Sequence, residues 1–173
     1  MEFKEKQHLK LWCLYLHLAA GATLVLCILI FDIGGMSFQQ LRESYFAPVL
    51  AVLISFVIII LVQQSKLTTL INQDSITYKH APFHGKSIEF KWLSLDKVYI
   101  RKYNAICEYG GYGIKTRFWF KFRDKAYILN GKNKGLQHEF KDGKRLLLSS
   151  NKIEELEMFL INLKTRYNIQ AIE

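Results

Sequence analysis

Two long apolar runs dominate the first 65 residues of the chain. They read LWCLYLHLAAGATLVLCILIFDI over 11–33 and YFAPVLAVLISFVIIILVQQ over 45–64. At a rise of 1.5 Å per residue, a helix over either run covers a hydrocarbon core of roughly 30 Å. We therefore expect residues 1–65 to form a two-span transmembrane hairpin, with spans at about 11–33 and 45–64. A buried helical hairpin is the alternative.

Charged residues around the two runs predict an orientation. Lys4, Lys6 and Lys10 precede the first run and Lys66 follows the second, whereas the connecting segment carries one basic residue, Arg42. Positively charged flanks stay on the cytoplasmic side of a membrane. We therefore expect a multi-pass protein of the bacterial inner (cell) membrane, with both termini in the cytoplasm and the lipid bilayer as an integral partner.

Two features inside the first run bear on function. His17 lies about one turn inside the predicted span, where it is either a neutral histidine near the headgroups or a functional group. The run also contains small residues that permit close approach of another helix. They are Ala19, Ala20, Gly21 and Ala22.

After Gln64 the apolar residues recur at every second position, which is typical of half-buried strands. SITYKH places Ile76, Tyr78 and His80 on one face, and KSIEFKW does the same for 88, 90 and 92. LDKVYIRKY predicts a third strand. Further on, GLQHEF and KRLLLSS flank the Asp-Gly pair at 142–143, which is a strong hairpin signal.

The chain is predicted to end in an amphipathic helix. Asn151 stands where it can cap the helix, and Glu154 is in capping-box position. An apolar stripe then recurs at helical spacing and must be covered by the sheet. Its members are Ile153, Leu156, Phe159 or Leu160, and Leu163.

Several segments of the second part resemble a known family. They are RKYNAICEYGGYGIK at 101–115, AYILNGKNKGLQHEFKDGKRLLLSS at 126–150, and the following KIEELEMFL. They resemble uncharacterised bacterial membrane proteins that carry two N-terminal transmembrane helices and a bacterial pleckstrin-homology (PH)-like domain. The chain departs from the family pattern where a proline is expected near Ala105 and a glycine near Ser149.

The resemblance implies an architecture and no biochemical activity. The expected fold is a membrane α-helical hairpin followed by an α+β PH-like domain over 66–173, an antiparallel β-barrel or sandwich closed by a C-terminal helix. Several antiparallel strands followed by one amphipathic helix is the element order of PH domains. The periodicity alone would also permit other small α+β folds.

The net charge of +9 resides wholly in the second part of the chain. Residues 66–173 contain 20 Lys and Arg against 11 Asp and Glu, whereas residues 1–65 contain four of each. Within this part, KTRFWFKFRDK alternates cations with aromatics. As one strand it would turn three phenylalanines to one face and a basic face with one tryptophan to the other.

That basic face is a candidate surface for anionic ligands. It consists of Lys115, Arg117, Trp119, Lys121 and Arg123. Basic residues near anionic headgroups contribute about 1 kcal/mol each. Cations around an aromatic ring also suit single-stranded nucleic acid, although we do not expect nucleic acid as the partner. A solvated strand face is the alternative.

A second candidate is a loop that docks an unknown protein partner. Gly110 and Gly111 permit positive φ, so the chain can bend there and hold a tyrosine on either side. Glu108 can pair with Arg101 or Lys102. The alternative is a strained turn with packed tyrosines. The candidate residues are Arg101, Tyr103, Glu108, Tyr109, Gly110, Gly111 and Tyr112.

Candidate catalytic chemistry is sparse. His80 and His84 have metal-like spacing, but Pro82 between them predicts a turn, and we expect neither a metal nor a cofactor. Cys107 lacks a positioned histidine. The segment NGKNKG at 130–135 lacks the spacing and the following helix of a phosphate-binding loop.

We therefore expect a membrane-anchored, non-catalytic PH-like binding or scaffold module that faces the cytoplasm. The alternative is an accessory subunit of a membrane enzyme or transporter complex, with the hairpin packed against other spans.

Overall fold

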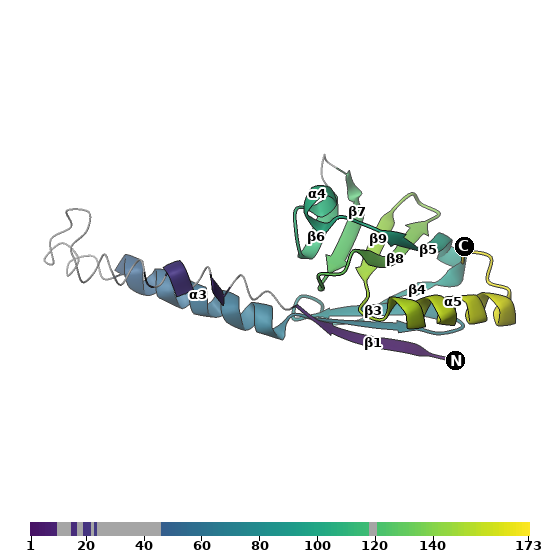
Figure 1. The fold of residues 1–173 in the computed structure, drawn as a ribbon, viewed down its shortest axis with the longest axis horizontal. Coiled ribbons are helices and arrows are strands. Elements are labelled where there is room, and N and C mark those ends of the chain that lie inside the picture. The colour runs from purple at the N-terminus through teal and green to yellow at the C-terminus, as the bar shows by residue number, and fades with distance from the viewer. Residues whose placement is uncertain (10–14, 17–18, 22, 24–45, 118–120) are drawn as a thin grey trace, which may run out of the picture. The chain divides into compact units, whose positions relative to one another are not determined.

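The structure is a computed structural model that describes residues 1–9, 15–16, 19–21, 23, 46–117 and 121–173. The chain divides into two compact units. One consists of Met1–Leu9 together with Ser65–Glu173, and the other of Lys10–Gln64. The first of these units contains all strands of the described residues (Figure 1).

Helix α3 (Phe46–Gln64) is the main described element of the unit 10–64. Among the described residues, no helix combines the length and the apolar character needed to cross a membrane. α3 ends in Gln63 and Gln64. The predicted transmembrane helix at 45–64 is wrong.

The same finding contradicts the expectations that depended on membrane spans. The integral partnership with a lipid bilayer and the multi-pass location in a bacterial inner membrane, with both termini in the cytoplasm, are not supported. The span expected at 11–33 lies outside the described residues, apart from 15–16, 19–21 and 23, and His17 lies outside them as well.

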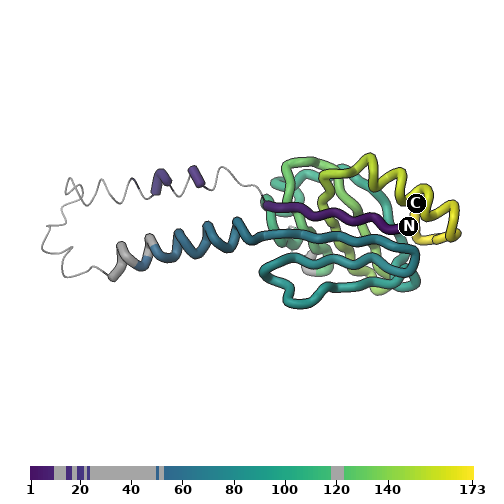
Figure 2. Tube along the Cα trace, turned by 90° about the horizontal axis from the view of Figure 1, so that it is seen from below, coloured from purple at the N-terminus to yellow at the C-terminus, as the bar shows by residue number. Residues whose placement is uncertain are grey.

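The N-terminal residues form a strand, β1 (Phe3–His8), which the sequence pattern did not predict. Phe3, Glu5 and Gln7 face inward and their neighbours face outward. Because two of these three inward residues are polar, the alternation of apolar residues that marks a strand is missing. β1 lies antiparallel beside β2 (Lys66–Ile71), which starts directly after α3 (Figure 2).

Two separate sheets make up the unit of 1–9 and 65–173. The first has the order β1-β2-β3-β4, with β3 at Ser75–Ala81 and β4 at Ile88–Lys91. The second has the order β5-β8-β9-β7-β6. Its strands are β5 (Leu95–Lys102), β6 (Gly113–Arg117), β7 (Lys121–Ile128), β8 (Lys134–Phe140) and β9 (Arg145–Ser149). A 3-10 helix, η1 (Trp92–Ser94), joins the sheets.

The expected PH-like fold is contradicted, since the two sheets do not close into a barrel and β7 and β9 run parallel. Hairpin signals in a sequence predict only neighbours along the chain. The predicted hairpin of β8 and β9 around 142–143 is confirmed, with Gly143 at a φ of 81°. The pairing of β7 with β9 joins segments that β8 separates, and no local signal specifies it.

The segment KTRFWFKFRDK is not one strand. It is divided between β6 and β7, which pair antiparallel with Arg117 opposite Lys121. Residues 118–120 lie outside the described residues, and so does the predicted role of Trp119.

The C-terminal helix α5 (Ile153–Tyr167) is confirmed, and its apolar stripe packs against both sheets. The buried members of the stripe are Ile153, Leu156, Leu160 and Leu163. The expected capping box is wrong. Lys152 is the N-cap and makes no side-chain cap bond. Instead the carboxylate of Glu5, from β1, accepts the N–H of Asn151 at 2.7 Å.

Candidate functional site

A short helix, α4 (Ala105–Tyr109), connects β5 to β6. The side-chain oxygen of Asn104 caps it by accepting the N–H groups of Ile106 at 3.1 Å and Cys107 at 2.9 Å. Gly110 ends it in the left-handed region at a φ of 71° and donates its N–H to the carbonyl of Ile106. A cap at each end thus stabilises a helix of five residues.

The guanidinium of Arg101, on β5, holds α4 from the side. Its Nη1 lies 3.0 Å from Oε2 of Glu108, and its Nη2 donates to the hydroxyl of Tyr109 at 2.8 Å. Its Nε donates to the side chain of Gln137, on β8, at 2.8 Å. A planar donor group shared among three partners fixes their relative geometry better than a lysine would.

A second arginine completes the arrangement from β6. The hydroxyl of Tyr109 donates to Oδ1 of Asp124 at 3.2 Å, and Nη1 of Arg117 lies 3.2 Å from Oδ2 of the same carboxylate. Arg117 also approaches Glu108 at 3.6 Å. Asp124 is only 5 % exposed. We call Arg101, Glu108, Tyr109, Arg117 and Asp124 the arginine–carboxylate network.

The network is balanced in charge, with two arginines and two carboxylates. Burial, followed by the negative charge of Asp124, raises the pKa of Tyr109 to about 12, so its hydroxyl keeps its proton at neutral pH. Every charged member has an oppositely charged partner within 4 Å. The network therefore holds α4 in place and leaves no charge of its own for a ligand.

Apolar side chains stand exposed on α4, after it and on β6; Ile114 belongs to the sheet face of Tyr127, and Asp124 meets Tyr109 on the other face. Ile106, on α4, is 65 % exposed, and Ile114, on β6, is 40 % exposed. Tyr112 is exposed between them in sequence, and Cys107 is an exposed free thiol. We call Ile106, Cys107, Tyr112 and Ile114 the α4–β6 surface.

The structure brings together several residues of the predicted partner-binding loop. The pairing of Glu108 with Arg101 is confirmed. Tyr103 is buried beside Tyr109 in a small apolar cluster and is not available to a partner. Gly110 and Gly111 both have positive φ. Sequence reasoning missed Asp124, Arg117 and Gln137 as members of this region, because only the folded sheet brings them next to α4.

The predicted basic face is distributed over two strands. Arg117 points into the arginine–carboxylate network, whereas Arg123, on β7, is exposed. Lys115 lies half-buried on β6. Lys121 begins β7, and its side chain lies outside the described part of the chain. These residues therefore do not share one face, and their anionic ligand stays a prediction.

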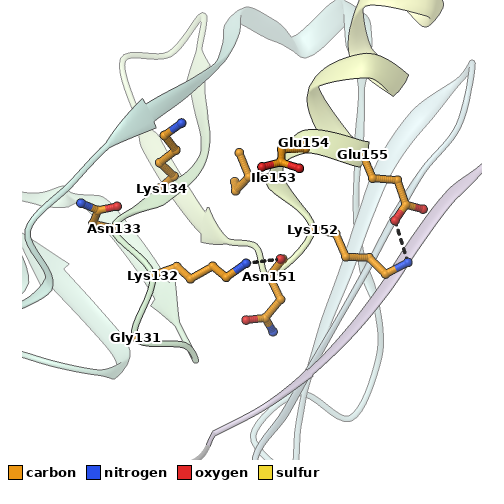
Figure 3. A pocket seen from close by; sticks show the side chains of 9 residues that line it. All are labelled: Gly131, Lys132, Asn133, Lys134, Asn151, Lys152, Ile153, Glu154 and Glu155. Atoms are coloured by element: carbon orange, nitrogen blue, oxygen red, sulfur yellow. Dashed lines mark hydrogen bonds and ion pairs between the residues drawn. The ribbon is translucent and has the colours of Figure 1, made fainter.

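A second candidate is a pocket of about 690 Å³ between the β7–β8 loop and the start of α5 (Figure 3). We call it the α5 pocket; residues 131–134 and 151–155 line it. The segment NGKNKG at 130–135 thus lies beside the start of a helix, α5, but this helix is remote in sequence. No local signal could have revealed this proximity.

Two of the lysines around the α5 pocket bond other residues that line it. Nζ of Lys132 donates to the carbonyl of Asn151 at 2.6 Å, and Lys152 pairs with Glu155 at 2.8 Å. Glu5 supplies a buried carboxylate directly before α5. Because a carboxylate already occupies the helix start, the attraction of this helix end for a further anion is reduced.

His80 and His84 lie close together, their ring centroids 6.3 Å apart. Nε2 of His80 contacts the hydroxyl of Ser65 at 3.1 Å, and Nε2 of His84 contacts that of Tyr127 at 3.3 Å. Burial, and then the proximity of His84, lower the pKa of His80 to about 4. Within the described ranges no group of three or more potential metal ligands is present.

Comparisons with known proteins identify no relative. No family model matches the chain, and no curated protein matches it. The family resemblance inferred from the sequence therefore stays a prediction.

Proposed function

We propose that the chain is a non-catalytic binding module that docks a protein partner on the α4–β6 surface. One observation carries this proposal. A five-residue helix, capped at both ends and tied to three strands by the arginine–carboxylate network, displays an isoleucine that is 65 % exposed.

Preorganisation explains why such an arrangement favours binding. Association costs about 0.5–1.5 kcal/mol for each flexible side chain that becomes ordered, and a loop that is already fixed avoids part of this cost. Ile106 gains nothing for folding by standing in solvent, whereas an apolar side chain at the centre of an interface contributes to affinity. Two arginines and two carboxylates of the arginine–carboxylate network hold α4, and with it Ile106, in place.

The same geometry favours binding over catalysis. The carboxylates of Glu108 and Asp124 are each paired with arginine, so both are engaged within the protein. The hydroxyl of Tyr109 is engaged as well, since it accepts from Arg101 and donates to Asp124. These polar groups bind one another within the protein. The exposed apolar side chains of the α4–β6 surface remain available to a partner.

Site-specific crosslinking in the source cell tests the proposal. A photoreactive amino acid replaces Ile106 in the full chain, and in a matched control it replaces Leu93, which is 82 % exposed on η1. We expect one discrete crosslinked product from position 106 and none from position 93. The product should disappear when Tyr112→Glu and Ile114→Glu are added. Equal crosslinking from both positions, or none from 106, contradicts the proposal.

A further inference from the structure

The two outer strands of the five-stranded sheet differ in how their free edges are covered. On β5, Val98 donates its N–H to the carbonyl of Ala171 at 2.6 Å, and its carbonyl accepts the N–H of Glu173 at 3.0 Å. Val98 and Ile172 form a parallel bridge. The C-terminal residues thus cover part of this edge.

β6 is the outer strand on the other side, and its described pairing is with β7 alone. Within residues 46–117 and 121–173, no segment pairs with its outer edge. An outer strand presents unpaired backbone N–H and C=O groups, and an extended peptide can add to them as a further strand. The uncovered edge runs through the α4–β6 surface, since Ile114 belongs to β6.

We propose that the partner docks by adding an extended acidic segment as a strand beside β6. This inference rests on the proposed function and specifies how the partner binds and what its chemistry is. The strand β6 offers five residues, Gly113–Arg117, which is a common length for a strand.

The acidic character follows from the charges beside this edge. Lys115, on β6, forms no ion pair among the described residues, whereas Arg117 is neutralised by Asp124. The unit made of 1–9 and 65–173 contains 22 Lys and Arg against 13 Asp and Glu, a net charge of +9. An acidic segment therefore meets a complementary field on approach and the lysine Lys115 on contact.

The same charges disfavour a second copy of the chain as the occupant. Two β6 strands placed antiparallel edge to edge would bring Lys115 of one chain near Lys115 of the other. Like charges on neighbouring strands destabilise their pairing. A partner with carboxylates beside Lys115 removes that repulsion.

The alternation along β6 predicts the pattern of the added segment. Ile114 and Thr116 are exposed on one face, and Lys115 lies on the other. In a paired strand, residues on the same face are neighbours. An apolar residue should therefore lie beside Ile114, and the acidic residues should lie on the face of Lys115.

Amide hydrogen exchange of the full chain tests this inference with a defined probe. The probe is a short acetylated peptide of alternating glutamate and valine, and its control replaces every glutamate by lysine. At millimolar concentration the acidic peptide should slow exchange in residues 113–117 by about tenfold or more, because new backbone hydrogen bonds protect the amides. The lysine peptide should leave their exchange unchanged.

A charge-reversal variant provides the second measurement. Lys115→Glu should weaken binding of the acidic peptide by about tenfold. The matched control is Lys79→Glu, at an exposed position of the central strand β3, which should bind the peptide like the unaltered chain. Thermal unfolding establishes that all variants are folded.

Three outcomes overturn the inference. Slowed exchange in 105–109 without protection of 113–117 excludes strand addition but leaves docking on the α4–β6 surface standing. No slowing in either segment excludes the acidic strand, and the crosslinking from position 106 then decides separately whether a partner docks there. Protection of 113–117 by an oligothymidylate that displaces the acidic peptide assigns the edge to nucleic acid.

Discussion

Both helices of the unit 1–9 and 65–173 begin beside a buried polar cluster, but the two clusters differ in charge. Next to α4, the carboxylates of Glu108 and Asp124 face two arginines. Next to α5, the buried carboxylate of Glu5 accepts bonds from a backbone N–H and from the hydroxyl of Ser150 at 2.7 Å. The cluster next to α4 pairs carboxylates with arginines, and the cluster next to α5 bonds one carboxylate to neutral donors.

The arginine–carboxylate network positions a surface, whereas the second cluster, which we call the α5 cluster, attaches the N-terminal strand to the rest of the fold. Glu5 and Gln7 bind residues more than 140 positions away, so they attach the N-terminal strand to the end of β9. The arginine–carboxylate network instead fixes a short helix beside an uncovered strand edge. Damage to the α5 cluster should therefore lower stability alone, whereas damage to the network should also impair docking.

Among single substitutions, the largest effect is expected from Asp124→Ala. It leaves Arg117 and the hydroxyl of Tyr109 without their buried partner, so unfolding free energy should fall by about 3 to 5 kcal/mol. Crosslinking from position 106 should fall with it. Chemical denaturation measures the first effect. Asp74→Ala, at an exposed loop position, is the control and should change neither.

Acidification tests His80, a buried histidine without a negatively charged partner that would stabilise its protonated form. The pKa of His80 is about 4 in the folded chain against about 6.5 in the unfolded chain, so the unfolded state binds its proton first. Stability should fall by about 3 kcal/mol between pH 6.5 and 4, and then level off. His138, fully buried, has a pKa lowered to about 4 by burial and adds a similar loss.

The variant His80→Gln separates the two histidines. It should remove roughly half of the pH dependence of unfolding between pH 6.5 and 4. A variant whose unfolding free energy depends on pH as steeply as that of the unaltered chain would show that His80 is not the responsible group.

A moderate effect is expected from Glu5→Ala. Asn151 and Ser150 lose their acceptor, and a charge-assisted bond of this kind contributes about 1 to 3 kcal/mol. Docking should persist in the folded variant, as judged by crosslinking from position 106. Glu2→Ala, next to β1 and exposed, is the matched control. Loss of crosslinking in the folded Glu5→Ala variant would abolish the distinction between the two clusters.

The smallest effect is expected from Gly110→Ala. The left-handed backbone at a φ of 71° disfavours a Cβ atom, so stability should fall by about 1 kcal/mol. Gly85→Ala, where a Cβ meets nothing within 4 Å, should be close to neutral. If both substitutions lower the melting temperature equally, α4 does not need a glycine at position 110 to end.

Local patterns predicted the elements of the second part of the chain well. The inward positions Ile76, Tyr78 and His80 of β3 are buried, as their spacing indicated. The stripe of α5 and the hairpin at 142–143 were also correct. In these segments the apolar period and the turn residues are enough to specify the local structure.

Pairings between distant segments could not be predicted from the sequence. β1 carries Glu5 and Gln7 on its inward face, and their partners 142 to 146 residues away are what make that face acceptable. The network likewise joins Arg101 to Asp124 through Tyr109, and only the pairings within the five-stranded sheet bring these residues together. The membrane helix at 45–64 was inferred from hydropathy alone and is contradicted.

Hydrogen exchange of the full chain bound to the partner captured from position 106 tests the central claim most directly. The measurement compares the α4–β6 surface with the α5 pocket within one sample. The account predicts slower exchange across residues 105–117 and unchanged exchange across 131–134 and 151–155. Protection of the pocket segments with no change across 105–117 would contradict it.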